Sequence, residues 1–393
     1  MPKILSVNAG SSSLKFKLYA MPAETVIMSG LVDRIGHSDA VFTYDYQGTH
    51  YKKAQAVQNH TEAVQLVTDA LLDSGAIRDK HEIVGIGHRV AHGGREYTQT
   101  TKITPVVQQK IADLATISPL HNPVNLLGIE AFDKLLPSAS EVAVFDTSFH
   151  STIPPKAYMY ALPFEYYAKY GIRRYGFHGQ SHQYIYSEVN RRYDQDFSRK
   201  IISCHLGNGA SVCAIRDGKS VNTSMGFTPL AGLVMGTRSG DVDPNVLPFI
   251  AEKENFSAAD IRQLLNHESG LLGISGVSND VRDVLQAEAD GNDRAKLALQ
   301  IYVHQIQSYI AAYTADLGGL QTLVFTAGVG EHSAPIRERV CAAFGYLGVK
   351  IDAEANQDND LDISAADSRV KVLVIPTNEE LVIARETEKI LDN

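Results

Sequence analysis

The chain has 393 residues, 44% of them hydrophobic, so it can bury substantial cores and its length favours two domains. The formal net charge of −9 and the absence of a long basic run argue against nucleic acid as a partner, but a phosphorylated ligand would respond to local arginines. No apolar stretch approaches the ~20 residues that span a bilayer, and no signal peptide is recognisable around Lys3, so we expect a cytoplasmic protein with no membrane partner.

The first informative stretch is Lys3 to Tyr19, KILSVNAGSSSLKFKLY. It predicts a β-hairpin whose loop could bind an oxyanion through backbone N–H groups and serine hydroxyls. From this stretch alone, a plain Gly/Ser turn without a ligand is the better explanation. A second copy, Lys200 to Lys219, lies nearly half the chain later and again places an Asn before small residues. We therefore expect a duplicated unit, with two phosphate-binding hairpins facing a cleft between two domains.

Strands and helices are predicted to alternate after the first hairpin. Helical spacing is clearest at 61–74, where Gly75 follows as a stop. Asn122 is expected to cap a helix over 123–135, with Pro123 at its first position. The strand at 141–145 delivers Asp146 at its carboxyl end, where ligands collect in open α/β sheets. The other expected elements are strands at 24–31, 40–46, 50–53 and 82–90 and a helix at 105–115.

Pro154 and Pro155 mark the expected domain boundary. The first domain is predicted to span residues 1–150, with the C-terminal helix 378–393 packing back on it, and the second to span 151–377. Residues 226–244 are too rich in turn residues for a plain connector, so this segment is a candidate functional loop. The second domain is expected to contain helices ending near 191 and at 243–252, 258–266 and 295–317, and strands at 322–326 and 370–375.

Several common motifs are absent from the sequence. Gly218-Lys219-Ser220 lacks the first glycine of a Walker A loop, and GIGHRV, GNGASV and GVGEHS each lack the third glycine of a dinucleotide fingerprint. Two i,i+4 histidine pairs could bind zinc on a helix, but their strand and glycine contexts favour structural or substrate-contacting roles. The cysteines have no metal-ligand spacing and are expected to be buried thiols. The two histidine pairs are His88 with His92 and His178 with His182, and the cysteines are Cys204, Cys213 and Cys341.

A positive constellation remains, in which every residue lies at the end of a predicted strand or in a glycine-flanked loop. Arg89 and Arg238 lie in HRVAHGG and GTRSGD, contexts unlike a solvated surface. Two such arginines suit an anionic acceptor together with a phosphoryl group in transfer. The constellation comprises Asn8, Arg89, Asp146, His178, Arg238 and Glu379.

The adjacent glutamates Glu379 and Glu380 are predicted to have different roles. If Thr377 caps the last helix, Glu380 stands at the third helical position and can complete a capping box. Glu379 is then left free to bind a metal ion.

Seven ordered motifs extend from residue 8 to residue 380: NAGSSSLKF, HRVAHGG, FHGQSH, HLGNGAS, GTRSGDVDP, AGVGEH and PTNEE. Together they resemble the acetate kinase family within the acetate and sugar kinase, Hsp70 and actin superfamily. The resemblance implies an α/β fold of two duplicated ribonuclease H-like, actin-like ATPase domains with ATP in the cleft between them. It also implies a homodimer and a reversible, Mg²⁺-dependent transfer from ATP to acetate that gives ADP and acetyl phosphate, with Mn²⁺ as an alternative metal.

The resemblance also implies the roles of individual residues. Asn8 and Glu379 would position magnesium and phosphate, and the catalytic residues would be Arg89, Asp146, His178 and Arg238. Arg89 would also bind the substrate, in an acyl pocket lined by Ala91, Leu120, Phe177 and Pro229. The nucleotide would be held by Ser12, Lys15, His205, Gly207, Asn208, Gly209, Asp280, Val281, Arg282, Gly328, Val329, Gly330, Glu331 and His332. Three positions depart from the usual family pattern: Gln180 replaces Thr, His332 replaces Asn, and Ala91 replaces a frequent Val.

The chemistry of the acceptor narrows the mechanism. A carboxylate with a reference pKa near ~4.3 is already ionised at pH 7 and needs no general base, so Asp146 is expected to organise Arg89 or magnesium. Catalysis must then come from holding two anions in line while positive charge offsets their repulsion. Because Ala91 would enlarge the acyl pocket, propionate kinase is an alternative. A non-catalytic, nucleotide-dependent module like actin or Hsp70 also stays open, although it would not need two arginines and a histidine.

Overall fold

A computed structural model describes residues 1–392. The chain divides into two compact units, each described by itself below. Unit 1 comprises Met1–Ser151 together with the segment from Asn378 onward, and unit 2 comprises Thr152–Thr377. We propose that these units are the two domains of the protein.

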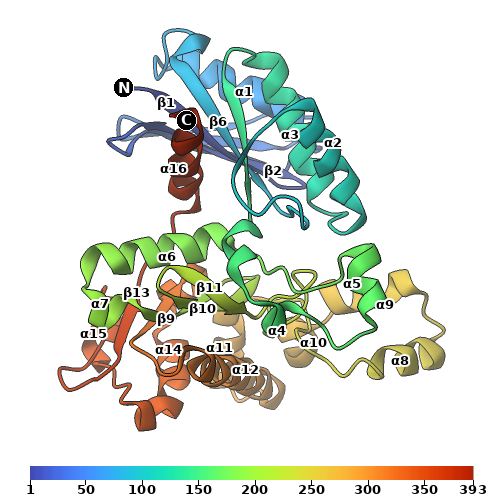
Figure 1. The fold of residues 1–393 in the computed structure, drawn as a ribbon, viewed down its shortest axis with the longest axis vertical. Helices are drawn as coiled ribbons and strands as arrows, with labels where there is room; N and C mark the ends of the chain where they lie inside the picture. Colours follow the sequence, from blue (N-terminus) through green and yellow to red (C-terminus); the bar gives the residue numbers. More distant parts are fainter. Residues whose placement is uncertain (393) are drawn as a thin grey trace. The chain divides into compact units, whose positions relative to one another are not determined.

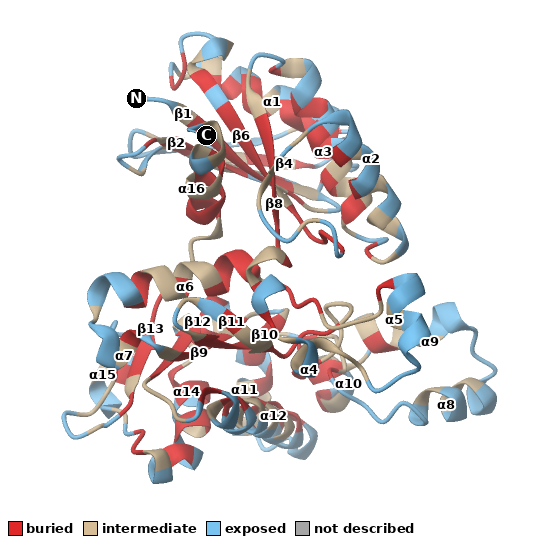
Figure 2. Ribbon diagram, in the orientation of Figure 1, coloured by how far each residue is buried: buried red, intermediate tan, exposed pale blue. Residues whose placement is uncertain are grey.

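Unit 1 is built on an eight-stranded sheet with the order β5-β4-β3-β2-β1-β6-β8-β7. The first two strands form the predicted antiparallel hairpin, and β1 then pairs in parallel with β6, as β6 does with β8. Figure 2 shows that the central strands are largely buried. The strands are β1 Lys3–Ala9, β2 Ser13–Ala20, β3 Thr25–Asp33, β4 Val41–Tyr46, β5 Thr49–Ala54, β6 Ile83–Val90, β7 Thr101–Lys102 and β8 Ser140–Phe145. The helices are α1 His60–Asp73, α2 Pro105–Asp113, α3 Asn122–Leu135 and α16 Glu379–Leu391, with short 3₁₀ turns η1 Lys80–Glu82, η2 Leu114–Thr116 and η3 Ser148–Thr152.

The two faces of β6 carry different residues because side chains alternate along a strand. One face carries Ile86, which belongs to the core beneath α1 and α3, and His88, whose ring contacts Phe132 of α3, whereas the other face has Gly85 and Gly87 and receives α16. A Cβ atom on Gly87 would lie 2.3 Å from the Thr387 hydroxyl and 2.5 Å from Ile383. The two glycines therefore let α16 lie directly on the sheet, and Figure 1 shows α16 across the sheet from α1, α2 and α3.

Unit 2 is built on a five-stranded sheet with the order β11-β10-β9-β12-β13. Its long helix α12 packs on β9, β10 and β11, and α6 packs on the other face of β9. The strands are β9 Lys200–Leu206, β10 Ala210–Arg216, β11 Lys219–Thr223, β12 Thr322–Thr326 and β13 Lys371–Val374. The helices are α4 Pro155–Tyr158, α5 Phe164–Tyr170, α6 Gly179–Arg192, α7 Gln195–Ser198, α8 Val246–Glu254, α9 Ala258–His267, α10 Gly270–Ser275, α11 Val281–Ala289, α12 Asp293–Leu317, α13 Ala327–His332, α14 Ala334–Cys341 and α15 Ala353–Asp358, with the 3₁₀ turn η4 Ala342–Leu347.

The two sheets share one topology. In unit 1 the order β3-β2-β1-β6-β8 has the same pattern as β11-β10-β9-β12-β13 in unit 2. In both, an antiparallel three-stranded meander is followed by two parallel strands. The predicted α/β fold class with a duplicated unit is confirmed.

Two local predictions about helix starts were wrong. Asn122 is the first residue of α3 and His121 occupies the N-cap position, because the Asn122 amide is turned inward to bond the backbone of His92. At α16 the N-cap is Asn378, whose Oδ1 accepts from the Leu381 N–H, so Thr377 is not the cap. In both cases an Asn or Thr suited to capping has a different bonding partner available through tertiary structure.

We predict that Gly87→Ala destabilises unit 1. The added methyl group overlaps Thr387 and Ile383, and such overpacking typically costs ~1–3 kcal/mol. Urea unfolding should therefore shift to lower concentration. Gly345→Ala is the control, because nothing lies within 4 Å of its added Cβ. Equal midpoints for the two variants would show that α16 does not pack tightly on β6.

Candidate active site

Unit 1 brings together an arginine cluster, defined here as Asn8, Arg89, Asp146 and Glu379. The Arg89 guanidinium grips the Asp146 carboxylate with two nitrogens, Nε at 2.9 Å from Oδ1 and Nη2 at 2.5 Å from Oδ2. Its third nitrogen, Nη1, donates to Asn8 Oδ1 at 3.1 Å. Asp146 is 1% exposed, whereas Arg89 is partly exposed. A buried carboxylate thus fixes an arginine whose edge can still reach a ligand.

Strand geometry explains why these residues meet. Asn8 and Arg89 lie at the carboxyl ends of the adjacent parallel strands β1 and β6, and Asp146 directly follows β8. Burial by itself would lower the pKa of Arg89, but the charge and hydrogen bonds of Asp146 outweigh burial and raise it. Arg89 therefore stays protonated, and Asp146 is committed to holding it.

The start of α16 supplies two glutamates with different surroundings. Glu380 is buried and forms ion pairs with Lys15 at 2.5 Å and Lys17 at 3.4 Å. Burial would raise the pKa of Glu380, but the two lysines bring it below its ordinary value. The predicted capping role of Glu380 was wrong, because it stands at the second helical position and pairs with these lysines.

Glu379 is partly exposed and interacts electrostatically with Arg89. Burial, together with the negative charges of Asp146 and Glu380, raises the pKa of Glu379 to about 7 even though Arg89 acts in the opposite direction. Within residues 1–392 it forms no ion pair at bonding distance. A carboxylate with this environment is suited to receive a cation.

Unit 2 carries a histidine–arginine cluster, defined as His178, His205, Gly209 and Arg238. The rings of His178 and His205 stack at 4.0 Å, and Ser211 Oγ lies 2.9 Å from His178 Nδ1. A Cβ placed on Gly209, in the β9–β10 turn, would lie 3.7 Å from His178 Nε2 and 3.5 Å from Arg238 Nη1. The imidazole and the guanidinium therefore both approach the same turn. His178 itself adopts a left-handed conformation with φ of 57° at the start of α6.

Arg238 differs from Arg89 in its charge balance. Its Nη1 donates to the Pro229 carbonyl at 3.0 Å, but no carboxylate within residues 1–392 forms an ion pair with it. Burial lowers the pKa of Arg238 below its usual value. A partly buried guanidinium without a counter-ion favours an incoming anion.

The predicted functional loop 226–244 holds Arg238 in place without regular structure. Gly240 has φ of +67°, and a Cβ there would lie 2.5 Å from the backbone of Leu233. Asp241 accepts from the Gly232 N–H at 2.8 Å and from the Tyr309 hydroxyl of α12. The loop therefore closes on itself around Arg238, and Asp241 connects it to α12 through Tyr309.

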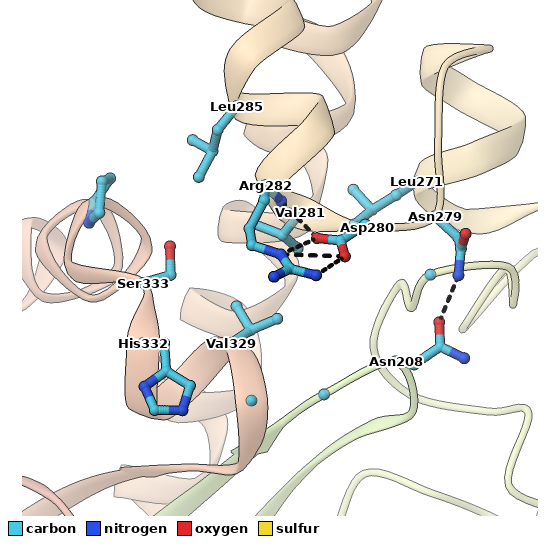
Figure 3. Close-up of a pocket in the computed structure, with 14 residues that line it drawn as sticks. Asn208, Leu271, Asn279, Asp280, Val281, Arg282, Leu285, Val329, His332 and Ser333 are labelled. Atoms are coloured by element: carbon cyan, nitrogen blue, oxygen red, sulfur yellow. Dashed lines mark hydrogen bonds and ion pairs between the residues drawn. The ribbon is translucent and has the colours of Figure 1, made fainter. Parts of the chain in front are cut away.

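A cavity of about 480 Å³ lies in unit 2 (Figure 3). Leu271, Val281, Leu285 and Val329 give it apolar lining, and polar side chains of the same helices, among them Arg282 on α11 and His332 on α13, line it as well. Its size falls in the range of small-molecule sites. Its lining residues are Gly207, Asn208, Gly236, Leu271, Asn279, Asp280, Val281, Arg282, Leu285, Gly328, Val329, His332, Ser333 and Pro335.

Eight of the predicted nucleotide residues line this cavity: Gly207, Asn208, Asp280, Val281, Arg282, Gly328, Val329 and His332. Gly330 and Glu331 do not line the cavity but hold neighbouring segments in place. The Glu331 carboxylate accepts from the Ala327 and Thr377 N–H groups, and the Gly330 carbonyl accepts from buried Arg337. His205 and Gly209 belong to the histidine–arginine cluster. Ser12 and Lys15 lie in unit 1, where Ser12 is exposed and Lys15 pairs with Glu380.

Sequence reasoning missed Gly236, Leu271, Asn279, Leu285, Ser333 and Pro335. Asn279 Nδ2 donates to Asn208 Oδ1 at 3.1 Å, and a Cβ on Gly236 would overlap that same oxygen at 2.1 Å. Leu285 stands one helical turn after Val281, so helical periodicity from the predicted Asp280–Arg282 segment could have found it. Gly236 could have been found from its place in the functional loop.

The residues predicted to line an acyl pocket have contrasting exposure. Ala91 is 4% exposed and Phe177 is 5% exposed, whereas Leu120 is 62% exposed. Ala91 and Leu120 belong to unit 1, and Phe177 and Pro229 belong to unit 2. The Pro229 carbonyl is the group that receives Arg238.

Comparisons with known proteins agree with this architecture. The model of the acetokinase family matches residues 3–385. A curated relative, the acetate kinase of Halothermothrix orenii, is 51% identical over the full length of both chains. The crystal structure of Porphyromonas gingivalis acetate kinase superposes with a TM-score of 0.92 at 43% identity and full coverage of both chains. A propionate kinase from Francisella tularensis has a TM-score of 0.93 at 38% identity, covering 99% of this chain and 100% of its own.

The fold and these sites define a phosphotransferase with the actin-like ATPase fold. Within that class, the chain belongs to the acetokinase family. None of the helices within residues 1–392 has the length and apolar character needed to span a membrane.

We predict opposite stability effects for the two glutamates. The folded-state pKa of Glu380 is depressed, so its stabilisation is present above the unfolded pKa and is lost as pH falls through the folded value. The folded-state pKa of Glu379 is raised, so its contribution is greatest below the unfolded pKa of 4.5 and is lost as pH rises through about 7. At pH 8, Glu380→Gln should destabilise by ~1–2 kcal/mol, a value reduced because Lys15 is half-exposed. Glu379→Gln should stabilise.

Thermal unfolding of both variants at pH 5 and pH 8 provides the measurement. Each variant is the matched control of the other, because they are neighbours with the same change. The assignment fails if both substitutions shift the transition in the same direction at pH 8.

Proposed function

We propose that this protein is an acetate kinase that reversibly transfers the γ-phosphoryl group of ATP to acetate, giving ADP and acetyl phosphate. The observation that best supports this mechanism is that Arg89 and Arg238 differ in how their charges are balanced. Arg89 is held by a buried carboxylate, whereas Arg238 has no counter-ion within the described chain. We assign Arg89 to the acetate carboxylate and Arg238 to the phosphoryl group.

The acceptor oxygen attacks directly. Acetate is ionised at neutral pH, so no group must remove a proton from it. Asp146 cannot easily serve as a base in any case, because both of its oxygens accept from Arg89. We propose that Asp146 orients Arg89 and that the P–O bond to acetate forms as the bond to the ADP oxygen breaks.

We propose that His178 and Arg238 stabilise the phosphoryl group during transfer. Charge accumulates on the equatorial phosphoryl oxygens, and preorganised donors lower the barrier by matching it. Ser211 supports this role because its hydroxyl contacts His178 Nδ1 and so orients the ring. We assign the nucleotide to the cavity of unit 2, whose apolar wall suits a base.

The family resemblance calls for Mg²⁺, and the residues present fit such an ion. Asn8 and Glu379 offer oxygen donors, and magnesium commonly uses one or two carboxylates together with substrate phosphates. The pKa of Glu379 near 7 is consistent with a carboxylate that is stabilised by an added cation. When bound, the ion would neutralise phosphate charge. Mn²⁺ has the same donor preference and could replace it.

We propose a homodimer and a cytoplasmic location, where ATP is available. Large apolar side chains are exposed on unit 2, which supports association through that unit. Phe164 of α5 is 67% exposed and Phe249 of α8 is 60% exposed. A non-catalytic nucleotide-dependent module is disfavoured, because it would not need the arginine cluster.

The reaction can be tested by trapping the acyl phosphate with hydroxylamine in the presence of ATP and acetate. We predict that Arg238→Ala lowers kcat by ~10² to 10³, because it removes charge required in the transition state. Thermal stability should be preserved, since the lost guanidinium has no ion-pair partner to leave behind. Exposed Arg262→Ala is the control and should keep full activity.

Absence of acetyl hydroxamate with the wild-type protein would refute the proposed reaction. Wild-type turnover by Arg238→Ala would instead refute only the role of that arginine.

The second candidate function is propionate phosphorylation. It is favoured by Ala91, which is buried and directly follows β6, the strand that carries Arg89. Compared with the Val frequent in the family, Ala removes two methyl groups. If Ala91 faces the acyl group, it leaves room for about one more carbon, worth roughly 0.8 kcal/mol per CH₂. We predict that Ala91→Val shifts preference from propionate towards acetate by ~5-fold to ~100-fold in kcat/KM.

The measurement is kcat/KM for acetate, propionate and butyrate in both proteins. Unchanged ratios would mean that Ala91 does not line the acyl pocket.

A further inference from the structure

The β1 and β6 strands separate just where the arginine cluster begins. Their parallel pairing ends at Val7 and His88. One residue further on, Arg89 Nη1 bonds the Asn8 side chain instead of a backbone group. Beyond that point a side chain from another element bridges the gap. This is Asn125 of α3, whose Oδ1 accepts from the Ala91 N–H at 3.0 Å and whose Nδ2 donates to the Ala9 carbonyl at 2.9 Å.

The Ala9 carbonyl belongs to the loop of the first hairpin, residues 9–13. Three carbonyls of this loop accept hydrogen bonds from residues outside it. Asn125 holds Ala9 O, His60 Nε2 donates to Gly10 O at 2.8 Å, and the Ile35 N–H donates to Ser12 O at 2.8 Å. Within residues 1–392, the N–H groups of Ser11 and Ser12 donate to no protein acceptor. A loop whose carbonyl oxygens mostly accept protein hydrogen bonds, and whose backbone N–H groups have no protein acceptor, is suited to bind an anion.

We propose that Asn125 is a positioning residue, which fixes the distance between this anion-binding loop and the strand that carries Arg89. Its amide replaces the ladder hydrogen bonds that the diverging strands cannot make. It is 4% exposed, and both of its polar atoms are used in this bridge. Asn125 would not touch the reactants. It acts through Ala9, next to Asn8, and through Ala91, two residues after Arg89.

The same helix offers a matched control. Asn122 is also buried and also bonds the chain after β6, accepting from the His92 N–H and donating to the carbonyls of His92 and Ile111. Among the described residues, its side chain bonds only His92 and Ile111 and not the first hairpin. Substitution at Asn122 and at Asn125 should therefore cost similar stability, but only Asn125 links the two ligand-binding segments.

The inference rests on the proposed reaction and is tested by Asn125→Asp and Asn122→Asp. In Asn125→Asp the nearly isosteric carboxylate can still accept from Ala91 but repels the Ala9 carbonyl. We expect kcat with acetate to fall ~10-fold to ~100-fold, because small misplacements of reacting groups have effects of this size. KM for ATP should stay within about twofold. Asn122→Asp should keep kcat within about threefold of the wild type at a similar loss of thermal stability.

Asn125→Ala, which removes the bridge without adding charge, is the second variant if Asn125→Asp does not fold, and it should show the same loss of kcat. The inference is overturned if Asn125 and Asn122 variants lose kcat in parallel with their stability. It is also overturned if both Asn125 variants fail to fold while Asn122→Asp folds, since Asn125 would then be required only for structure. Lack of acetate phosphorylation by the wild-type protein would instead refute the proposed function.

Discussion

The close packing of α16 on the glycine face of β6 is the constraint on which unit 1 depends. Gly85 and Gly87 leave no side chain between strand and helix, so the helix from the end of the sequence lies on a strand formed by residues 83–90. Arg89 follows on the same face because strand side chains alternate. The start of α16 therefore lies by Arg89, and Glu379 and Glu380 enter its electrostatic environment. The packing of α16 on Gly85 and Gly87 therefore brings Glu379 close to Arg89.

The sequence predicted elements whose determinants are local. The duplicated hairpins, the helix at α1 and the strand ending at Asp146 all follow from periodicity and turn residues, and each was found within a few residues of its observed bounds. The short helix α13 was not among the predicted elements, because its sequence AGVGEH contains two glycines; its first residue, Ala327, adopts a left-handed conformation. Short helices of this kind depend on tertiary contacts, here the Glu331 carboxylate and Arg337.

Residues of the candidate site could be predicted only where they lie within a recognisable sequence motif. Arg89, Asp146 and Arg238 were predicted as site residues from context, but the sequence could not show that Asp146 binds Arg89 with both oxygens while no carboxylate within residues 1–392 pairs with Arg238. The assignment of Glu380 failed for the same reason. Capping depends on local order, whereas its partners Lys15 and Lys17 come from β2, more than 350 residues earlier in the chain. Such long-range pairs leave no periodic signal.

The contrast between the two arginines is what the proposed assignment to a carboxylate and a phosphoryl group would require. A carboxylate acceptor must be held in a fixed orientation, and Arg89 is rigid because Asp146 and Asn8 occupy its other donors. A phosphoryl group carries more negative charge as it moves, so an arginine whose charge is not already neutralised can respond most strongly to it. A carboxylate paired with Arg238 would weaken that response. The net charge of −9 is compatible with two anionic substrates because each would respond to the local charge of an arginine and not to the sum over the chain.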